Sequence, residues 1–356
     1  MQARTFRVID TGIRDGRRQI AFDQALIDAH KAGSIPDTIR FLRFPPTALI
    51  GRHQALSSEI KLDYCRAHGV GVVRRITGGG AIYFDEGQLG WELVFHRKTL
   101  KIGSLAELTR EICEAAAAGL SKLGVAARYR PRNDIEVDGR KISGTGGFFD
   151  QDTLFYQGTV LVDMNAAEMT AALKVPEAKL AKRSLDSAAQ RVVTLKELLG
   201  AAPSIEAVKE ALLAGFGERL GITAMAGAIT AREEELAAQY YDEEIGTDAF
   251  VAEIDEPGAG AEVQSASHTG AGGTITVYAR LAGPQRDRID RVLITGDFFV
   301  TPPRTVFDLE AALRNVSVGE AGQAVERFFT QARVGLLSVS SDDFRNAVEA
   351  ALAVAR

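Results

Sequence analysis

The sequence has few cysteines, no long apolar run and no excess of basic residues, and each shortage excludes a class of protein. Only Cys65 and Cys113 occur in 356 residues, too few for a disulfide framework or a four-ligand zinc site. No apolar stretch reaches the roughly 18 residues that span a bilayer. Net charge is −5, which disfavours broad electrostatic binding of nucleic acid. Residues 1–10 lack the apolar core of a signal peptide, so we expect a cytoplasmic protein without membrane or nucleic-acid partners.

The remaining composition indicates a globular chain with more than one domain. Hydrophobic residues make up 46% and charged residues 25%. Strand-like and helical segments alternate without the regular spacing of a βαβ array, which favours an α+β fold with mixed sheets. A Gly/Ala-rich segment at 251–273 is interpreted as a linker. It would separate a large domain over 1–250 from a small α+β domain over 274–356.

A glycine-rich run at 74–84 carries the first functional signal. It comprises Arg74, Arg75, Gly78, Gly79, Gly80, Ala81, Ile82 and Tyr83. Glycines let a ligand lie on the backbone, and N–H groups beside arginines suit a phosphate or a carboxylate. The chain contains no G-x-x-x-x-G-K-[ST], so the run is not a P-loop. Taken alone, the run is equally compatible with an ordinary turn.

A lysine before a second glycine-rich turn carries the other signal. Lys141 follows the hairpin pair Asp138-Gly139 and precedes a turn with Gly144 and Thr145. Lysine is a compact cation that suits two anionic groups at once. Asp134 could hold this lysine or the ribose of a ligand. A solvated hairpin lysine is the alternative interpretation of this segment alone.

Together these segments resemble the lipoate–protein ligases of the biotin/lipoate ligase superfamily. The matching blocks are Gly51-Arg52-His53-Gln54, Arg74 to Asp85, Asn133-Asp134-Ile135, Lys141 to Gly146, Gly158 to Leu161 and Gln190 to Leu195. The resemblance covers about residues 5–220. Ile294 to Val300 resembles part of the accessory domain of these ligases. The resemblance therefore implies a biotin/lipoate ligase-like mixed-sheet catalytic domain with a fused accessory domain.

The resemblance also implies a chemistry and a set of site residues. ATP would convert lipoate to lipoyl-AMP, and a lysine of an acceptor protein would then take the lipoyl group. Lys141 would be catalytic, and Mg²⁺ would be held through the phosphates, with no protein ligand assigned. ATP and lipoyl-AMP would contact Arg74, Arg75, Gly78, Gly79, Gly80, Ala81, Ile82, Tyr83, Asp134, Lys141, Gly144 and Thr145. The acyl group would be oriented by Arg52, His53, Gln157, Gly158 and Thr159, in a tunnel with residues such as Leu49, Ile82 and Trp91.

Two other functions stay open, and the first is a cysteine-free transferase that takes lipoyl or octanoyl groups from carrier thioesters without ATP. The superfamily's octanoyltransferases, which need no ATP, carry a nucleophilic cysteine either shortly before the Asn-Asp block or well after the lysine. Cys65 and Cys113 lie in helical segments and are expected to be inert. A non-catalytic acyl-binding relative is the third possibility. The acceptor could be a lipoyl domain, a glycine-cleavage H-like protein or a specialised lipoate-binding carrier. Phe84 and Gln157 replace histidines of many ligases, which bears on acyl and acceptor specificity.

Overall fold

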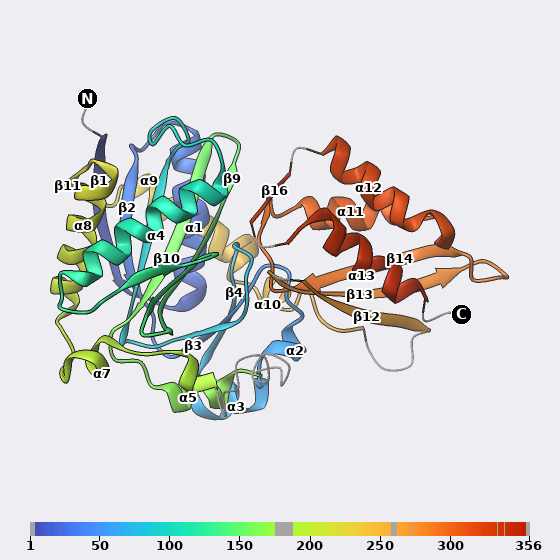
Figure 1. Cartoon of the computed structure of the whole chain (residues 1–356), viewed down its shortest axis with the longest axis horizontal. Coiled ribbons are helices and arrows are strands. Elements are labelled where there is room, and N and C mark those ends of the chain that lie inside the picture. Colours follow the sequence, from blue (N-terminus) through green and yellow to red (C-terminus); the bar gives the residue numbers. More distant parts are fainter. Residues whose placement is uncertain are drawn as a thin grey trace.

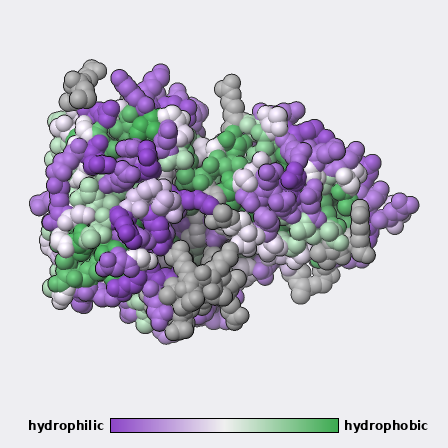
Figure 2. Space-filling model, in the orientation of Figure 1, coloured by the Kyte–Doolittle hydropathy of each residue, from purple (hydrophilic) through white to green (hydrophobic). Residues whose placement is uncertain are grey.

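Two bodies lie side by side in the computed structural model of the chain (Figure 1). The structure describes residues 4–174, 188–257, 262–270, 272–332, 334–337 and 339–353. The larger body is built on an eight-stranded sheet and the smaller one on a three-stranded sheet. Within the described residues, no helix is both long enough and apolar enough to cross a membrane. Figure 2 shows a largely hydrophilic face with several hydrophobic patches, one of which lies where the two bodies meet.

The eight-stranded sheet is mixed and has the order β11-β1-β2-β6-β10-β9-β8-β7. Its strands are β1 (Arg4–Ile13), β2 (Thr38–Arg43), β6 (Gln88–His96), β7 (Arg128–Arg130), β8 (Asp134–Val137), β9 (Arg140–Asp150), β10 (Thr153–Leu161) and β11 (Ile222–Ala226). Strand β1 pairs in parallel with β2 and β11, and the other neighbours are antiparallel. The predicted α+β class with a mixed sheet is confirmed.

Two helices cover each face of this sheet. Helices α4 (Leu105–Ser121) and α8 (Ile205–Leu220) share one apolar core with the sheet, and α1 (Gly16–Lys31) and α9 (Ala231–Tyr240) share the core on the opposite face. Helices α4 and α8 pack closely because Gly119 has no side chain. A Cβ at this position would lie 2.3 Å from the carbonyl oxygen of Ala211. Helix α9 begins at a capping box formed by Thr230 and Glu233, a signal that the sequence prediction missed.

A small second sheet carries the glycine-rich run. Its strands, in the order β4-β3-β5, are β3 (Thr47–Ile50), β4 (Gly71–Arg74) and β5 (Ile82–Phe84). Around it lie α2 (Leu56–Glu59), α3 (Leu62–His68), α5 (Ala166–Ala172) and α10 (Asp248–Val251). The remaining short elements of this body are η1 (Ala188–Arg191), α7 (Leu195–Leu199) and η2 (Tyr241–Ile245). The run itself is the connection between β4 and β5, so both of its ends are fixed by strand pairing.

The smaller body has an apolar core of its own between its sheet and three helices. Its elements are β12 (Val263–Gly270), β13 (Gly273–Ala282), β14 (Arg288–Gly296), β15 (Val300–Thr301), α11 (Thr305–Leu313), η3 (Val318–Glu320), α12 (Ala321–Gln331), β16 (Gly335–Leu336) and α13 (Ser341–Ala353). Strand β12 lies within the segment predicted as a linker and pairs along its length with β13. The linker expectation is thus wrong for residues 263–270, where pairing with β13 overrides a weak strand pattern. The division at 1–250 and 274–356 remains a proposal.

Candidate functional site

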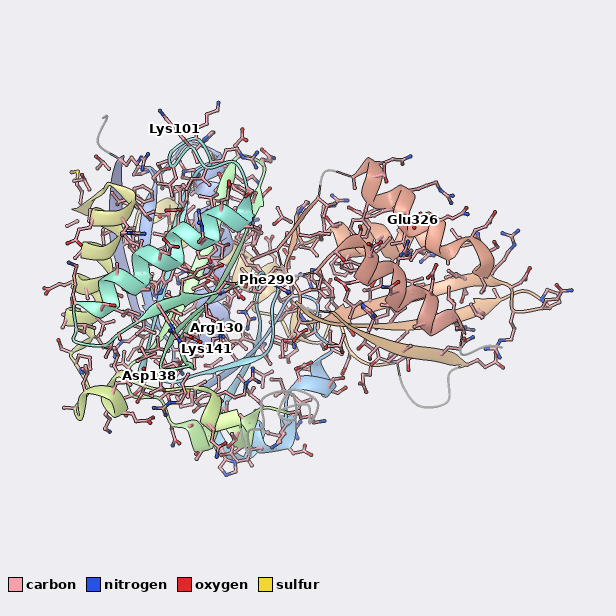
Figure 3. The ribbon with its side chains drawn as sticks, viewed as in Figure 1. Lys101, Arg130, Asp138, Lys141, Phe299 and Glu326 are labelled. Atoms are coloured by element: carbon pink, nitrogen blue, oxygen red, sulfur yellow. The ribbon has the colours of Figure 1, made fainter. Side chains whose placement is uncertain are left out.

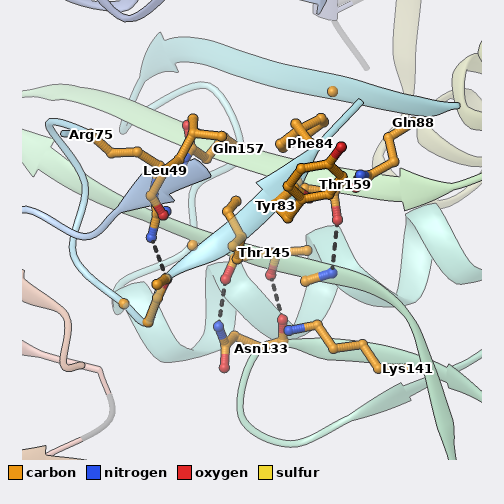
Figure 4. Close-up of a pocket in the computed structure, with 18 of the residues that line it drawn as sticks. Leu49, Arg75, Tyr83, Phe84, Gln88, Asn133, Lys141, Thr145, Gln157 and Thr159 are labelled. Carbon is orange, nitrogen blue, oxygen red and sulfur yellow. Dashed lines mark hydrogen bonds between the residues drawn. The ribbon is translucent and has the colours of Figure 1, made fainter. Parts of the chain in front are cut away.

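A cavity of about 530 Å³ lies between the glycine-rich run and strands β9 and β10. Figure 4 shows Arg75 and Tyr83 approaching it from one side and Asn133 and Lys141 from the other. Of the predicted site residues, those that line it are Arg75, Gly78, Gly79, Gly80, Ala81, Ile82, Tyr83, Asp134, Lys141, Gly144, Thr145, Gln157, Gly158 and Thr159. Arg52, His53 and Arg74 do not. The structure therefore brings together segments that are far apart in the sequence, as predicted.

Lys141 stands at the charged end of the cavity, on β9. Its Nζ lies 2.8 Å from Oδ1 of Asp134, and Arg130 donates to the other oxygen of the same carboxylate. Figure 3 shows Arg130 and Lys141 close together on this body. Burial alone would raise the pKa of Asp134, but the ion pairs with Lys141 and Arg130 outweigh it and hold the pKa below its usual value. The ammonium group is thus positioned by an ionised partner.

Glycine at position 144 makes room for this lysine. A Cβ on Gly144 would lie 2.5 Å from Nζ of Lys141. The turn between β8 and β9 has positive φ at both Asp138 (49°) and Gly139 (79°), as a tight hairpin requires. The predicted hairpin at Asp138-Gly139 is confirmed, but the predicted turn at Gly144 and Thr145 is wrong, because these residues continue strand β9 and pair with β8 and β10.

Hydrogen bonds tie the segment after Lys141 to the Asn-Asp block. The hydroxyl of Thr145 donates to the carbonyl oxygen of Asn133 at 2.9 Å, and the Asn133 side chain donates to the carbonyl of Thr145. The N–H of Gly144 donates to the hydroxyl of Thr159 at 3.3 Å. On the neighbouring strand, Gln157 donates from Nε2 to the hydroxyl of Thr77 at 2.8 Å. The floor of the cavity is therefore a rigid part of the large sheet.

The side chain of Arg75 shapes the glycine-rich run from within. Its Nη1 donates to the carbonyl oxygen of Leu49 at 3.0 Å, and its Nη2 donates to those of Gly78 and Gly80 at 3.2 and 2.8 Å. Burial lowers its pKa to about 10, so it keeps its charge at neutral pH. Arg75 lines the cavity as predicted, but its guanidinium donates to carbonyls of the run and of β3.

Arg74 is a correction to the sequence prediction. Its side chain is fully buried outside the cavity lining, and its guanidinium donates to main-chain carbonyls of two segments. Those carbonyls belong to Gly51, Arg52, Gln54, Phe250, Val251 and Ile254. The contacts join the chain after β3 to α10. Arg74 therefore bonds the main chain of the protein and does not line the cavity in which a phosphate was expected.

Arg52 and His53 are also corrected, because they lie where the two bodies meet. The Arg52 guanidinium pairs with Glu253 at 2.7 Å and lies over the ring of Phe307, 5.0 Å from its centroid. The His53 ring stacks on Phe298, with centroids 5.3 Å apart. Burial first, then the charges of Arg52 and Arg74, lower the pKa of His53 to about 3. His53 is thus a neutral packing residue and does not line the cavity in which an acyl group was expected.

The cavity also has charged residues that sequence reasoning missed. Arg130, Lys174 and Arg191 add positive charge to its lining. At the other end lie Asp23 and Glu92, both of which bond the buried guanidinium of Arg40. Burial raises the pKa of both carboxyls. A signal existed for Glu92, because it interrupts an otherwise apolar stretch of β6.

Apolar side chains form the end of the cavity away from Lys141. Leu49, Ile82 and Trp91, which the sequence prediction placed in an acyl tunnel, all line it. Further apolar lining residues include Ile20, Leu42 and Phe44. The cavity therefore joins a cationic end to an end lined mainly by apolar side chains, with Asp23 and Glu92 beside them, and this suits a molecule with an anionic head and an aliphatic tail.

Both cysteines are buried, and neither lines the cavity. The Cys113 sulfur lies 3.2 Å from the hydroxyl of Thr145 and 3.5 Å from that of Tyr156. Burial raises the pKa of Cys113 to about 11 and also raises that of Cys65. A thiol must ionise to act as a nucleophile, and burial opposes ionisation in both. The expectation that both are inert agrees with these surroundings.

Known proteins similar in sequence carry two kinds of name. The family model described as the lipoyl protein ligase A/B catalytic domain matches residues 15–217. Octanoyltransferase LipM of Symbiobacterium thermophilum is 32% identical over 266 residues, which cover 68% of this chain and 96% of that protein. Lipoate-protein ligase A subunit 1 of Thermoplasma acidophilum is 31% identical over 242 residues, covering 65% of this chain and 90% of that protein.

Solved structures extend the likeness to the fold. A bi-partite lipoate protein ligase with its E2 lipoyl domain, from Thermoplasma acidophilum, matches with a TM-score of 0.63 and 27% identity, covering 72% of this chain and 99% of that chain. A lipoate-protein ligase A bound with ATP matches at 0.60 and 27%, covering 71% and 99%. LipL1 of P. falciparum in complex with lipoate matches at 0.73 over 97% of this chain and 98% of that chain. Its 17% identity supports the fold alone.

Proposed function

Since this chain belongs to the lipoyl protein ligase A/B family, we propose that it activates lipoate with ATP and transfers the lipoyl group to a lysine of an acceptor protein. Membership makes it an enzyme of the lipoate ligase and octanoyltransferase family. The observation that carries the ATP-dependent form is the burial of Cys65 and Cys113, the chain's two cysteines. Without a thiolate to form an acyl-enzyme, a free lipoate carboxylate needs a leaving group before an amine can attack it, and AMP supplies one.

The proposed reaction has two steps. An oxygen of the lipoate carboxylate attacks the α-phosphorus of ATP, a phosphorus–oxygen bond breaks, and pyrophosphate leaves. The amine of the acceptor lysine then attacks the acyl carbon, a carbon–nitrogen bond forms, and AMP leaves. Lys141 would offset the repulsion between carboxylate and phosphate in the first step. We propose that Arg130, Lys174 and Arg191, which line the cavity, supply the other positive charges near the phosphates. Arg74 was expected to do so but does not line the cavity.

A protein-bound Mg²⁺ does not fit the described part of the chain. Those residues contain no group of three or more His, Cys, Asp or Glu side chains suited to a metal ion. Asp134 already bonds Lys141 and Arg130. No step of the proposed reaction therefore uses a metal held by protein ligands, and Mg²⁺ would enter only with the triphosphate.

Octanoyl transfer without ATP is the second candidate. The name of one relative favours this candidate. Octanoyltransferase LipM of Symbiobacterium thermophilum is 32% identical to this chain over a match that covers 96% of that protein. Such a transfer would take the acyl group from a thioester carrier. For Cys113 to act as the nucleophile, its thiol would have to leave the hydrogen bonds with Thr145 and Tyr156 and lose a proton despite burial.

The acceptor is proposed to be a lipoyl domain in the cytoplasm. A similar ligase from Thermoplasma acidophilum was solved with its E2 lipoyl domain, which supports this choice. A glycine-cleavage H-like protein and a specialised lipoate-binding carrier are the other acceptors to test. Offering all three with one acyl donor identifies the acceptor by the mass gained on its lysine.

The ATP-dependent ligase and the ATP-independent transferase can be distinguished by the acyl donor that each one uses. The purified chain is incubated with lipoate and ATP, and separately with an octanoyl-carrier thioester without ATP. We expect release of pyrophosphate that depends on lipoate, and lipoylation of the acceptor in the first mixture only. Transfer from the thioester without ATP would replace the ligase proposal by the second candidate. Absence of both, together with lipoate binding, would indicate a non-catalytic relative.

Cysteine variants give the matched control. Cys113→Ser keeps a hydroxyl near Thr145 and Tyr156, and Cys65→Ser changes a cysteine far from this cluster. We expect both variants to retain lipoate-dependent pyrophosphate release within about twofold, and mass spectrometry to find no acyl adduct on either cysteine. An octanoyl adduct on Cys113 that disappears in Cys113→Ser would show that the buried thiol is the nucleophile.

A further inference from the structure

The smaller body contributes a phenylalanine to the wall of the cavity. Phe299 follows β14 and lines the cavity together with Asp297. Figure 3 places it between the two bodies. Its ring lies against glycines of both motif segments: a Cβ on Gly79 would lie 2.6 Å from Cζ of this ring, and a Cβ on Gly146 would lie 2.2 Å from its Cε1. One side chain from the smaller body therefore occupies the space that two glycines leave open.

Main-chain and core contacts hold this ring in place. The N–H of Gly79 donates to the carbonyl of Phe298 at 3.0 Å, and the N–H of Gly296 donates to the carbonyl of His53 at 3.0 Å. The N–H of Leu337 donates to the carbonyl of Phe299 at 3.3 Å. Phe298 is fully buried against His53 and against Phe344 of α13. The ring of Phe299 is thus presented by a fixed turn and is not a loose surface group.

The ring stands between the two ends of the cavity. Gly144 and Gly146 point to the same face of β9, about 6.6 Å apart along the strand. Nζ of Lys141 lies over Gly144, and Phe299 lies over Gly146. Two residues further along β9, Phe148 belongs to the apolar core that also contains Leu42 and Phe44. A chain that extends from Lys141 toward the apolar end must therefore pass the ring.

We propose that Phe299 determines acyl specificity by narrowing this passage, so that straight medium-chain acids are admitted and acids with a branch a few bonds from the carboxylate are rejected. This role of Phe299 rests on one part of the proposed function, namely that the cavity binds the acyl group. It does not depend on whether the acyl donor is the free acid with ATP or a thioester. A role in packing alone would instead lower activity equally for every acid.

The test compares Phe299→Ala with Phe307→Ala. Phe307 belongs to the same body and contacts Arg52 and His53 of the larger body, but it does not line the cavity. Each protein is given octanoic acid and 4-methyloctanoic acid with ATP, and the same two acyl groups as carrier thioesters. We expect the ratio of kcat/KM for the branched over the straight acyl group to rise at least tenfold in Phe299→Ala and to stay within twofold of the parent in Phe307→Ala.

Two further measurements test the role of Phe299 even if Phe299→Ala folds poorly or the acyl donor is not the expected one. Phe299→Leu retains most of the apolar contact with the glycines and should give an intermediate ratio, even if Phe299→Ala is poorly folded. Calorimetric binding of the two free acids needs neither ATP nor a thioester. An altered binding ratio without pyrophosphate release would sink the ligase proposal and leave the role of Phe299 standing. Equal ratios in the parent, Phe299→Leu and Phe307→Ala would overturn the role of Phe299.

Discussion

The glycine-rich run and the β8–β9 hairpin form opposite walls of one cavity but use their charged residues in different ways. In the run, Arg74 and Arg75 are buried and donate to main-chain carbonyls. In the hairpin, Lys141 is partly exposed at the cavity and pairs with the carboxylate of Asp134. The arginines of the run therefore bond main-chain carbonyls of this and other segments, whereas the hairpin places the charge of Lys141 at the cavity.

The same contrast applies to the glycines of the two walls. A Cβ on Gly144 would meet only the flexible end of Lys141, which can move. A Cβ on Gly78 would lie 2.2 Å from the main-chain oxygen of Phe298, which cannot move without displacing the smaller body. Glycine is therefore required for two different physical reasons, namely space for the Lys141 side chain at Gly144 and space for the main chain of the smaller body at Gly78.

Replacing Lys141 should give the largest effect on activity. Lys141→Ala removes the cation nearest to the proposed reacting groups, and we expect a loss of about 100- to 1,000-fold in acyl-adenylate formation. Thermal unfolding of the variant should match the parent, because the lysine lies at the cavity surface. Full activity in Lys141→Ala would mean that the hairpin lysine is an ordinary surface group.

Replacing Arg74 should give the largest effect on stability. Arg74→Ala leaves several buried carbonyls without a donor, each of which costs about 1–3 kcal/mol, and the free energy of unfolding in urea should fall by at least about 3 kcal/mol. Arg74→Lys should recover only part of this, since one ammonium group cannot reach all the carbonyls. A stable Arg74→Ala protein that loses only ATP affinity would restore the phosphate-binding role.

Gly144→Ala should mainly lower activity, whereas Gly78→Ala should mainly lower stability. Gly144→Ala displaces the Lys141 ammonium, so we expect roughly a tenfold loss of activity, about 1.4 kcal/mol in the barrier, with little change in melting temperature. Gly78→Ala must push away the Phe298 carbonyl and should lower the melting temperature. If the two variants lose stability equally, the distinction between the two walls fails.

The smallest predicted effect is a pH dependence of the free energy of unfolding, caused by the buried, neutral His53. Its pKa of about 3 in the folded protein lies below the ordinary value of 6.5, so the unfolded chain takes up a proton first as the pH falls. This contribution to stability is therefore present above pH 6.5 and is lost as the pH falls, by about 1 kcal/mol between pH 7.0 and 5.5. His53→Phe should abolish this loss in urea titrations at pH 7.0 and 5.5. An unchanged pH dependence would show that His53 is not protected in the folded state.

Much of the architecture was predictable because local signals were strong. Ser104 caps α4 by accepting the N–H of Glu107, and Gly69 ends α3 with a φ of 66°. The Asp138-Gly139 turn fixed the hairpin that carries Lys141. In contrast, β12 was missed because its small polar residues show little strand preference, and only pairing with β13 and packing of α13 make it a strand.

The sequence by itself determined the family, the α+β class and most of the residues that line the cavity, because these depend on local order and spacing. It did not determine which cations of a motif face the ligand. Arg74 is adjacent to Arg75 in the sequence, yet one lies outside the cavity lining and the other within it. Only the tertiary structure decided this, because burial of a charged side chain depends on carbonyls near positions 52 and 252 that folding brings to it. The same is true of Phe299, which reaches the glycines from more than 150 residues away because the smaller body packs against the run.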